Sequence, residues 1–461
     1  MADRINESIS QFIFDLKYEN IPPEVTFHLK NILLDSYGCG LFGSTTPWMK
    51  IYKDVLLKMT DRQEATIWGT NQKTSTTAAM MLNGSAINSF ELDDTHTDGI
   101  IHVSTGVLGC ITAFAESLGT VSGKDFLTAA VLAFEIACRV AAPIGTELAH
   151  QGFNNTGTCC PFGSAAGVAK MLGLTKEQVI HAMGITGNWS SGLQAVQFAS
   201  MAKRIVPSKS SEGAIVGCLL AKEGFTGIED VFENKFGGFY NCFTDDVYNI
   251  ERTAGELGDR WELLGIGLKF YSTCRSKHST IDTLRRFRQE HPEVKPEDIK
   301  KIRVGTTSIT HKYSVDADAI TSVVAAQLSH PYVCAVTMLE GNAFVDQFTE
   351  EKIRNKEILD FAKKVEVYTD EEIEKLPRAL RYTVNVEVEL NSGQKYAMKT
   401  EYPKGHPKNP FTKDELLWKF NSLAGKVFTD EERRKNIVEA VLNLEELDNI
   451  QTLTSLLRKE A

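Results

Sequence analysis

The chain has 461 residues, of which 42% are hydrophobic and 24% charged, and it carries a formal net charge of -10 at pH 7. This length predicts more than one domain, and the composition is that of a folded globular protein rather than a disordered one. Because the net charge is negative, we expect neither a nucleic acid nor an acidic membrane surface as a partner. An anionic ligand would need a local group of basic residues.

Nine cysteines are present, and no two are spaced as a CxxC pair. Most lie in apolar runs, as Cys138 and Cys218 do, which favours reduced core residues and a cytoplasmic protein. The N-terminal residues lack an apolar stretch behind a basic start, so we expect no secretory signal. The apolar window 127–149 contains Glu135 and Arg139, which predicts a buried helix rather than a membrane span.

The first half of the chain predicts helices, because apolar residues recur there at helical spacing. Small residues such as Gly84, Gly106 and Gly109 would let helix backbones approach closely, and Thr175 with Gln178 forms a capping box. The predicted helices span 22–41, 75–91, 105–117, 125–142, 161–172, 175–187 and 211–223.

After Trp261 the pattern changes to strands alternating with helices. Strands are predicted over 300–307, 364–368, 382–390 and 394–400, and helices over 279–289, 317–340 and 353–363. Asn391-Ser392-Gly393 is a hairpin turn signal between the last two strands, and the chain from Phe411 onward reads as helical again. We therefore predict a mainly α protein with a helical domain formed by 1–267 and 403–461, and a smaller α/β domain at 268–402.

One polar cluster follows the second of these helices. It consists of Glu91, Asp93, Asp94, Thr95, His96, Asp98 and, after a short gap, His102. Carboxylates and histidines at this density are costly to leave unpaired. His102 is expected near a helix N-terminus, where the helix dipole disfavours imidazolium and favours an anionic ligand, so that His102 could accept a proton. Three other interpretations are a solvated capping region, a divalent metal site, and the aspartate-rich element of terpene synthases, which lacks a second motif here.

Two basic clusters could neutralise carboxylates of a ligand. Lys203 and Arg204, with Lys209 following, come after an apolar run, and a surface pair at a helix end explains them as well. The second cluster contains Lys269, Cys274, Arg275, Lys277 and His278, just before a predicted helix start. A basic hinge between domains is the alternative interpretation of the second cluster.

Six stretches, in this order, carry a family resemblance: ELDDTH (91–96) with His102, LGLTKEQVIHAMGITG (172–187), MAKR (201–204), EGFTGIEDVFENKFGG (223–238), LKFYSTC followed by KHSTIDT (268–283), and AAQLSHPY (325–332). Together they resemble the MmgE/PrpD family, which includes 2-methylcitrate dehydratases, cis-aconitate decarboxylases and iminodisuccinate epimerases. The first stretch is more similar to the pattern of the cis-aconitate decarboxylases.

The resemblance implies a homodimer whose subunits have a large helical domain and an α/β lid, and which needs neither cofactor nor metal. It implies a lyase, either a decarboxylase or a dehydratase, that acts on a small polycarboxylic acid. One alternative is an epimerase of a dicarboxylic, amino-acid-like substrate such as iminodisuccinate. Another is a catalytically silent family member that binds a tricarboxylate.

The resemblance also implies roles for residues of this chain. His102, which would move a proton, Lys203 and Lys269 match catalytic positions. Substrate-binding positions are matched by Glu91, Asp93, Asp94, Thr95, His96, Arg204, Cys274 and His278. The chain departs from the family at Asn154, where many members have a histidine, and in the stretch 205–211, where Lys209 adds a charge. The substrate and the reaction therefore stay open at this point.

Overall fold

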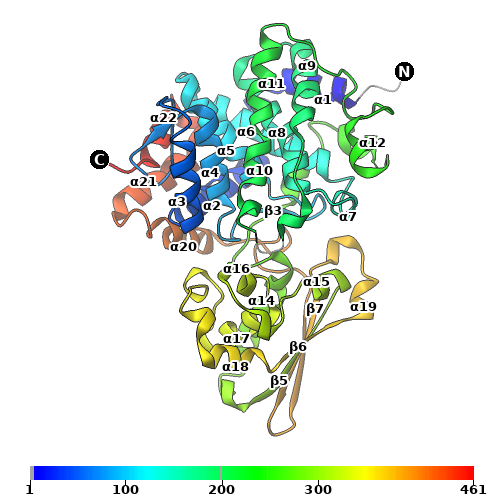
Figure 1. Cartoon of the computed structure of the whole chain (residues 1–461), viewed down its shortest axis with the longest axis vertical. Coiled ribbons are helices and arrows are strands. Elements are labelled where there is room, and N and C mark those ends of the chain that lie inside the picture. Colours follow the sequence, from blue (N-terminus) through cyan, green and yellow to red (C-terminus); the bar gives the residue numbers. More distant parts are fainter. Residues whose placement is uncertain (1–4, 198–199, 247, 461) are drawn as a thin grey trace. The chain divides into compact units, whose positions relative to one another are not determined.

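The computed structural model describes residues 5–197, 200–246 and 248–460. The chain divides into two compact units (Figure 1). The first unit consists of the residues through Ser89, then Asp93–Ile266, and the part from Thr412 onward; the second consists of Phe90–Leu92 and Gly267–Phe411. The chain thus enters the second unit twice, the first time for three residues only.

The first unit is built from helices. They are α1 (Ile5–Asp15), α2 (Pro23–Gly43), α3 (Pro47–Leu56), α4 (Thr76–Ile87), α5 (Val103–Leu118), α6 (Gly123–Ala141), α7 (Glu147–His150), α8 (Asn155–Leu172), α9 (Lys176–Thr186), α10 (Val206–Ser210), α11 (Glu212–Lys222), α12 (Phe239–Thr244), α13 (Ile250–Ala254), α20 (Lys413–Ala424), α21 (Glu431–Leu442) and α22 (Gln451–Leu456).

Short elements connect these helices. The 3₁₀ turns are η1 (Tyr18–Asn20), η2 (Gly187–Trp189), η3 (Gln194–Gln197), η4 (Met201–Arg204), η5 (Glu262–Gly265) and η12 (Leu444–Glu446). The two-residue strands are β1 (Ala65–Thr66), β2 (Lys73–Thr74), β3 (Thr95–His96) and β4 (Ile266–Gly267).

The helices begin where the local sequence satisfies their first backbone N–H groups. Pro23, which has no N–H to satisfy, opens α2, and Thr175 with Gln178 forms the predicted capping box of α9. Helix α8 starts six residues before the predicted helix, because the side chain of Asn154 accepts a hydrogen bond from the N–H of Gly157. Pro161, which the sequence suggested as a start, lies inside α8.

Small residues bring the central helices α4, α5, α6 and α8 into close contact, as the sequence predicted. A Cβ atom on Gly109 of α5 would lie 2.5 Å from the backbone nitrogen of Gly84 in α4. One on Gly163 of α8 would lie 2.2 Å from the carbonyl oxygen of Ala133 in α6. Because no non-hydrogen atom fits at such distances, only glycine is compatible with these helix crossings.

Helix α6 confirms the prediction of a buried charged helix. Glu135 and Arg139 are fully buried one turn apart, and Nε of Arg139 donates to the Glu135 carboxylate at 2.5 Å. The Arg139 guanidinium also donates to the backbone carbonyls of Gly255 and Glu256. Among the residues that the structure describes, none of the helices combines the length and the hydropathy needed to cross a membrane.

The second unit is an α/β unit (Figure 1). Its strands are β5 (Ile299–Thr306), β6 (Val365–Thr369), β7 (Val384–Leu390) and β8 (Lys395–Thr400). Its helices are α14 (His278–Glu290), α15 (Ser308–Lys312), α16 (Val323–Gln327), α17 (His330–Glu340), α18 (Lys356–Ala362) and α19 (Glu371–Glu374). Its 3₁₀ turns are η6 (Arg275–Lys277), η7 (Pro296–Asp298), η8 (Ala317–Ala319), η9 (Val345–Gln347), η10 (Lys352–Arg354) and η11 (Arg378–Leu380).

The sheet has the strand order β6-β5-β7-β8, in which β5 and β6 are parallel and the other pairs antiparallel. Along β7 every second residue is buried, from Val384 to Leu390, and packs into a core that includes Ile281, Leu284 and Phe287 of α14. The predicted hairpin between β7 and β8 is confirmed, with Gly393 in the left-handed region at φ 89°. The mainly helical, two-domain fold class is likewise confirmed.

The predicted helix over 317–340 is wrong, because this stretch forms η8, α16 and α17 in succession. The side chain of Ser329 caps α17 by accepting from the N–H of Tyr332, and Pro331 occupies the first turn. A proline in the middle of a longer helix would remove one backbone hydrogen bond and clash with the preceding turn. A new helix therefore begins at this point.

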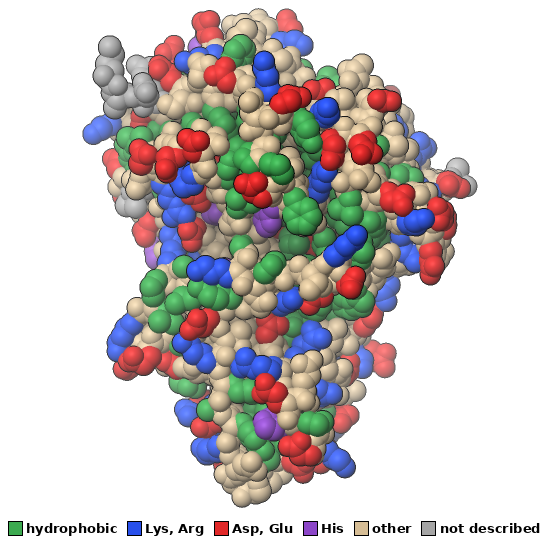
Figure 2. Space-filling model, turned by 180° about the vertical axis from the view of Figure 1, so that it is seen from behind, with side chains coloured by type: hydrophobic (Ala, Val, Ile, Leu, Met, Phe, Trp, Pro, Cys, Tyr) green, Lys and Arg blue, Asp and Glu red, His purple; other side chains and the backbone are tan. Residues whose placement is uncertain are grey.

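Charged side chains of both signs lie on the face shown in Figure 2. Figure 2 shows acidic and basic groups interspersed on the face that it presents, separated by apolar and neutral side chains. Of the nine cysteines, seven are buried, while Cys242 is exposed and Cys274 is partly exposed. The burial of these seven confirms the core role predicted for most of them.

We expect Gly109→Ala to lower the free energy of unfolding by about 1 kcal/mol. Helix propensity alone favours alanine by about 1 kcal/mol, but the added methyl group would meet the backbone of Gly84 at 2.5 Å and force the helices apart. Urea denaturation followed by circular dichroism measures the change. The control is Ser117→Ala at an exposed position of the same helix; equal midpoints for the two variants would contradict close packing at Gly109.

Candidate active site

The N-terminus of α5 is closed by a carboxylate of the chain itself. Asp94 accepts hydrogen bonds from the backbone N–H groups of Val103 at 3.1 Å and Ser104 at 3.0 Å. Burial and the adjacent Asp93 raise the pKa of Asp94 to about 6, outweighing its hydrogen bonds to Ser104 and the nearby His102. The sequence predicted an anionic ligand at this helix end; the anion found there is Asp94.

His102 is the N-cap residue of α5, as predicted, and its ring is paired with Asp93. Its Nδ1 atom lies 2.9 Å from Oδ2 of Asp93 and 3.2 Å from the backbone oxygen of Asp94. Two oxygen acceptors at Nδ1 place the ring proton on that nitrogen, so that Nε2 is left for proton exchange. The His102 side chain is 21% exposed, whereas Asp93 is fully buried.

A second buried ion pair lies beside these acids. Lys419, on α20, contacts Asp35, on α2, with Nζ 2.7 Å from Oδ1, and both side chains are fully buried. Burial raises the pKa of Asp35 while Lys419 lowers it, and Asp93 adds a further increase because it is near. The ammonium of Lys419 thus offsets the charge of Asp35, so that this buried pair adds little net charge near Asp93.

Thr95 and His96 form the short strand β3, and their side chains have different surroundings. The hydroxyl of Thr95 is buried and has no hydrogen-bond partner among the described residues. Nδ1 of His96 accepts from the N–H of Gly99 at 3.1 Å, and its Nε2 faces Glu262 at 3.6 Å. Of these two predicted substrate contacts, Thr95 has hydrogen-bonding capacity left, whereas both ring nitrogens of His96 already face protein groups.

Lys203 and Arg204 lie in the 3₁₀ turn η4 and are largely buried, with exposures of 7% and 3%. Nη1 of Arg204 donates to the carbonyl of Asn88, the residue that follows α4, at 2.8 Å. The pair is therefore not a solvated surface pair, which was the alternative interpretation from the sequence. Lys209 is exposed.

Asn154, the departure from the family pattern, has a structural role. Its side-chain oxygen accepts from the N–H of Gly157 at 3.1 Å and so caps α8. The hydroxyl of Thr156, in the first turn of α8, accepts the backbone N–H of His102 at 3.0 Å. The start of α8 thus helps to fix the start of α5.

In the second unit, Glu91 pairs with Lys269. Nζ of Lys269 lies 3.4 Å from Oε2 of Glu91, and the two side chains are 0% and 3% exposed. Glu91 has φ 58°, a left-handed backbone that a non-glycine residue rarely adopts. The carbonyl of the preceding residue, Phe90, accepts from the hydroxyl of Ser272 and the amide of Gln327, which fixes residues 90–92 in this unit.

The remaining residues of the second basic cluster lie in and around η6. The hydroxyl of Ser276 donates to Sγ of Cys274 at 3.4 Å and accepts from Nζ of Lys277 at 3.5 Å. Burial raises the pKa of Cys274, but the Lys277 ammonium and the Ser276 hydrogen bond outweigh it, so that the pKa falls to about 7. The ring of His278 is buried and contacts Arg275 and the carbonyl of Thr273.

The predicted residues thus form two groups. The helical unit holds Asp93, Asp94, Thr95, His96, His102, Lys203 and Arg204, and the second unit holds Glu91, Lys269, Cys274 and His278. Direct contacts join Asp93 to His102 and Glu91 to Lys269. Sequence reasoning missed Lys419 and Glu262, because their partners are far away along the chain and no local pattern marks them.

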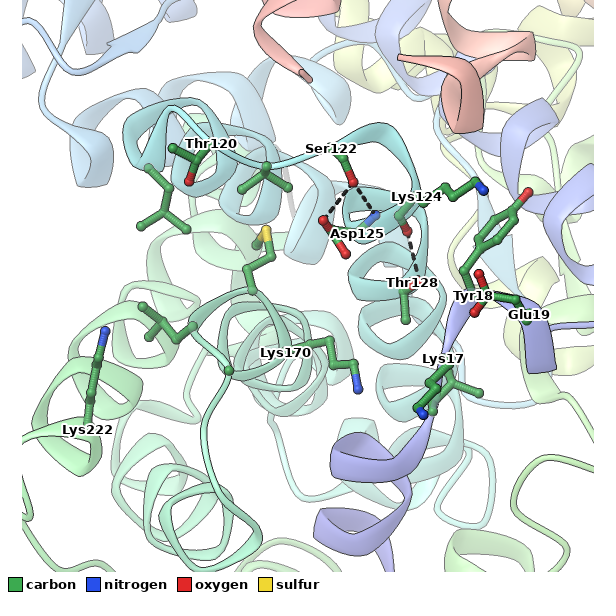
Figure 3. A pocket seen from close by; sticks show the side chains of 16 residues that line it. Lys17, Tyr18, Glu19, Thr120, Ser122, Lys124, Asp125, Thr128, Lys170 and Lys222 are labelled. Atoms are coloured by element: carbon green, nitrogen blue, oxygen red, sulfur yellow. Dashed lines mark hydrogen bonds between the residues drawn. The ribbon is translucent and has the colours of Figure 1, made fainter. Parts of the chain in front are cut away.

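A cavity of about 670 Å³ lies elsewhere in the helical unit. Figure 3 shows the side chains that line it, among them Lys17, Ser122 and Lys170, and the predicted site residues do not belong to that lining. Nζ of Lys170 is bound to the carbonyls that end α1, at Ile13 and Phe14. Within the described part of the chain, His, Cys, Asp and Glu side chains form no group that could hold a metal ion.

Two family models match the chain. The model of the MmgE/PrpD N-terminal domain matches residues 7–251, and that of the MmgE/PrpD C-terminal domain matches residues 271–444. Together they cover most of the chain, including every residue of the two groups except Lys269, which lies between the two matches.

Similar proteins include a cis-aconitate decarboxylase from Aspergillus terreus, 29% identical over 471 residues that cover 98% of this chain and 96% of that protein. The cis-aconitate decarboxylase of Homo sapiens is 26% identical, with 99% and 95% covered. The 2-methylcitrate dehydratase of Salmonella typhimurium is 22% identical, with 81% and 80% covered.

We expect iodoacetamide to alkylate Cys274 at neutral pH, at a rate that rises with pH and is half-maximal near pH 7. The thiolate is the reacting form, and because the pKa of Cys274 is lowered to about 7, about half of the Cys274 side chains are thiolates at that pH. Peptide mass spectrometry measures the rate, with the exposed Cys242 as an internal reference. In Lys277→Gln the half-maximal rate should move to higher pH; an unchanged pH profile would contradict the role of Lys277.

Proposed function

Because the chain belongs to the MmgE/PrpD family, we propose that it is a lyase that removes carbon dioxide or water from a small polycarboxylic acid. The full-length similarity to cis-aconitate decarboxylases supports this class, as does the similarity to a 2-methylcitrate dehydratase. The higher identity of the decarboxylases favours cis-aconitate as the first substrate to test.

The observation that carries the proposal is the pair formed by Asp93 and His102 at the start of α5. Asp93 holds the proton on Nδ1, which fixes the tautomer and directs Nε2 away from the buried acids. A nitrogen held in this way can take a proton from a substrate or return it. His102 is the partly exposed member of the pair, so it is the one that a ligand can reach.

The same pair suits both lyase reactions. In a decarboxylation the bond to the leaving carboxylate breaks, its electron pair stays on carbon, and that carbon then takes a proton from the His102 imidazolium. In a dehydration neutral His102 removes a proton from carbon and hydroxide leaves. Asp93 stabilises the imidazolium of either reaction electrostatically.

Basic residues would bind the carboxylates of the substrate and stabilise the developing negative charge. Lys203 and Arg204 are buried cations of the helical unit, and Arg204 presents a planar fork that suits a carboxylate. Lys269 of the second unit is bound by Glu91, and a substrate carboxylate would compete for the same ammonium. The hydroxyl of Thr95 would add a hydrogen bond. His96 and His278 would hold neighbouring groups of the protein in place rather than bind the substrate, because their ring nitrogens face protein groups.

We further propose that the enzyme needs no cofactor or metal and acts as a homodimer, as the family resemblance implies. We also propose that it is cytoplasmic, which the apolar surroundings of its cysteines favour. Sedimentation equilibrium of the purified chain measures the oligomeric state. A sedimenting species with the mass of one chain would overturn the homodimer.

An NMR time course tests the function. Purified protein is mixed with cis-aconitate, 2-methylcitrate, citrate or iminodisuccinate in deuterated buffer, with and without a chelator. Loss of carbon dioxide or water that the chelator does not affect supports the proposal and identifies the substrate. Deuterium uptake without loss of either would replace the lyase by an epimerase, and binding without any reaction would replace it by a silent tricarboxylate-binding protein.

We expect His102→Gln to lower kcat by roughly 10²-fold or more on the substrate so identified, because glutamine cannot exchange a proton near neutral pH. The matched control is His150→Gln, which changes an exposed histidine of the same unit and should leave kcat unchanged. Turnover of His102→Gln close to that of the control would remove His102 from the mechanism.

We expect Lys269→Met to raise KM by about tenfold or more, which corresponds to the loss of one charge-assisted hydrogen bond. The variant also leaves Glu91 without its ammonium partner, so the double variant Lys269→Met, Glu91→Gln is measured beside it. A carboxylate-binding lysine predicts that KM stays raised in the double variant. A return of KM to the wild-type value would mean that Lys269 only neutralises Glu91.

A further inference from the structure

A second ionic network holds the turn between Thr95 and His102. In this turn the N–H of His96 donates to the carbonyl of Ile101 and the N–H of Ile100 donates to the carbonyl of His96, each at 2.9 Å. Ile100 has φ 55°, which is unfavourable for a β-branched residue. A turn with a strained residue keeps one conformation only when its surroundings fix it.

Glu262, the first residue of η5, lies at the centre of the network. Its carboxylate faces Nε2 of His96 at 3.6 Å and accepts from Nε of Arg252 at 3.2 Å and from Arg260. Arg252 in turn donates to the carboxylate of Asp98, on the same turn as His96. Glu262 thus holds the turn at two points, directly at His96 and through Arg252 at Asp98.

The geometry fixes one tautomer of His96. Because Nδ1 accepts the N–H of Gly99, the proton of the neutral ring sits on Nε2, the nitrogen that faces Glu262. The fit around the ring is close: a Cβ atom on Gly265 would lie 2.9 Å from Nε2. Burial raises the pKa of Glu262, but His96 and Arg252 outweigh it and lower the pKa to about 2, so the acceptor stays charged at neutral pH.

Glu262 is itself held by the core of the unit. The carboxylate of Glu135, on α6, accepts the backbone N–H groups of Glu262 at 3.1 Å and Leu263 at 2.9 Å. Glu135 also binds Arg139, whose guanidinium donates to the carbonyls of Gly255 and Glu256 and to that of Arg260. A continuous series of contacts therefore leads from the fully buried helix α6 to the turn that precedes His102.

We propose that Glu262 is a positioning residue for His102, acting through His96 and the turn 96–101. The proposal rests on the proposed function in so far as it takes His102 to be the proton-transfer residue. Glu262 itself does not touch the substrate. Its effect is on the placement of the imidazole, to which proton transfer is sensitive at the scale of an ångström.

The test compares Glu262→Gln with Glu256→Gln. Glu256 lies on the same segment and pairs with Arg260, but its side chain is 60% exposed. In Glu262→Gln we expect kcat to fall about tenfold to a hundredfold with KM little changed, whereas Glu256→Gln should match the wild type in both. A fall in kcat without a rise in KM distinguishes misplaced proton transfer from lost substrate binding.

Ring spectra of selectively ¹⁵N-labelled histidine give a second readout, with His96→Gln and His102→Gln used for assignment. In the wild type we expect His96 to carry its proton on Nε2. In Glu262→Gln the Nε2 signal of His96, which faces the altered side chain, and the ring signals of His102 should shift. Unchanged His102 signals together with unchanged kcat in Glu262→Gln would overturn the proposal, as would a wild-type His96 protonated on Nδ1.

A third variant covers the case in which Glu262→Gln does not fold. Asp98→Asn removes the negative charge by which the turn pairs with Arg252. It should lower kcat as Glu262→Gln does, but less strongly. If kcat and the His102 signals equal those of the wild type, the proposal is overturned. If no polycarboxylate is turned over at all, the proposed function fails, while the ring spectra still decide whether Glu262 positions His102.

Discussion

The burial of two adjacent carboxylates, Asp93 and Asp94, is the constraint on which the helical unit depends. Neither could remain charged in the interior without compensation. Asp94 is compensated by the N–H groups that open α5, and Asp93 by His102. The charge of nearby Asp35 is compensated by Lys419. Because Lys419 comes from α20, the last part of the chain is tied electrostatically to a site formed by residues more than three hundred positions earlier.

The elements of the fold could largely be predicted, because their signals are local. Pro23, the capping box at Thr175 and the alternation along β7 each act within a few residues. The predicted helix bounds were wrong where two local signals competed. Pro161 was taken for a helix start although Asn154 caps α8 earlier, and the apolar run over 317–340 concealed the new start at Ser329.

The candidate site was predicted only in part, for the same physical reason. His102 could be placed at a helix start because the chain nearby shows it, and the residues that match the family could be named. The pairing of Lys269 with Glu91 joins positions 178 residues apart, and Glu262 reaches His96 across a similar separation. Such partners are chosen by the fold and leave no pattern in the sequence around them. Asn154 adds a contrasting case, since its side chain satisfies a helix end at a position where the family resemblance implies a histidine.

The segment 90–92 bears on whether the helical unit can be produced by itself. The body of the second unit, Gly267–Phe411, is one continuous insertion into the helical chain, yet Phe90–Leu92 belongs to it as well. A shortened chain without the insertion would lack Ser272 and Gln327, which bind the carbonyl of Phe90, and Lys269, which pairs with Glu91. Because a buried carboxylate needs a compensating partner, a protein trimmed to its helical part needs changes at residues 90–92 as well.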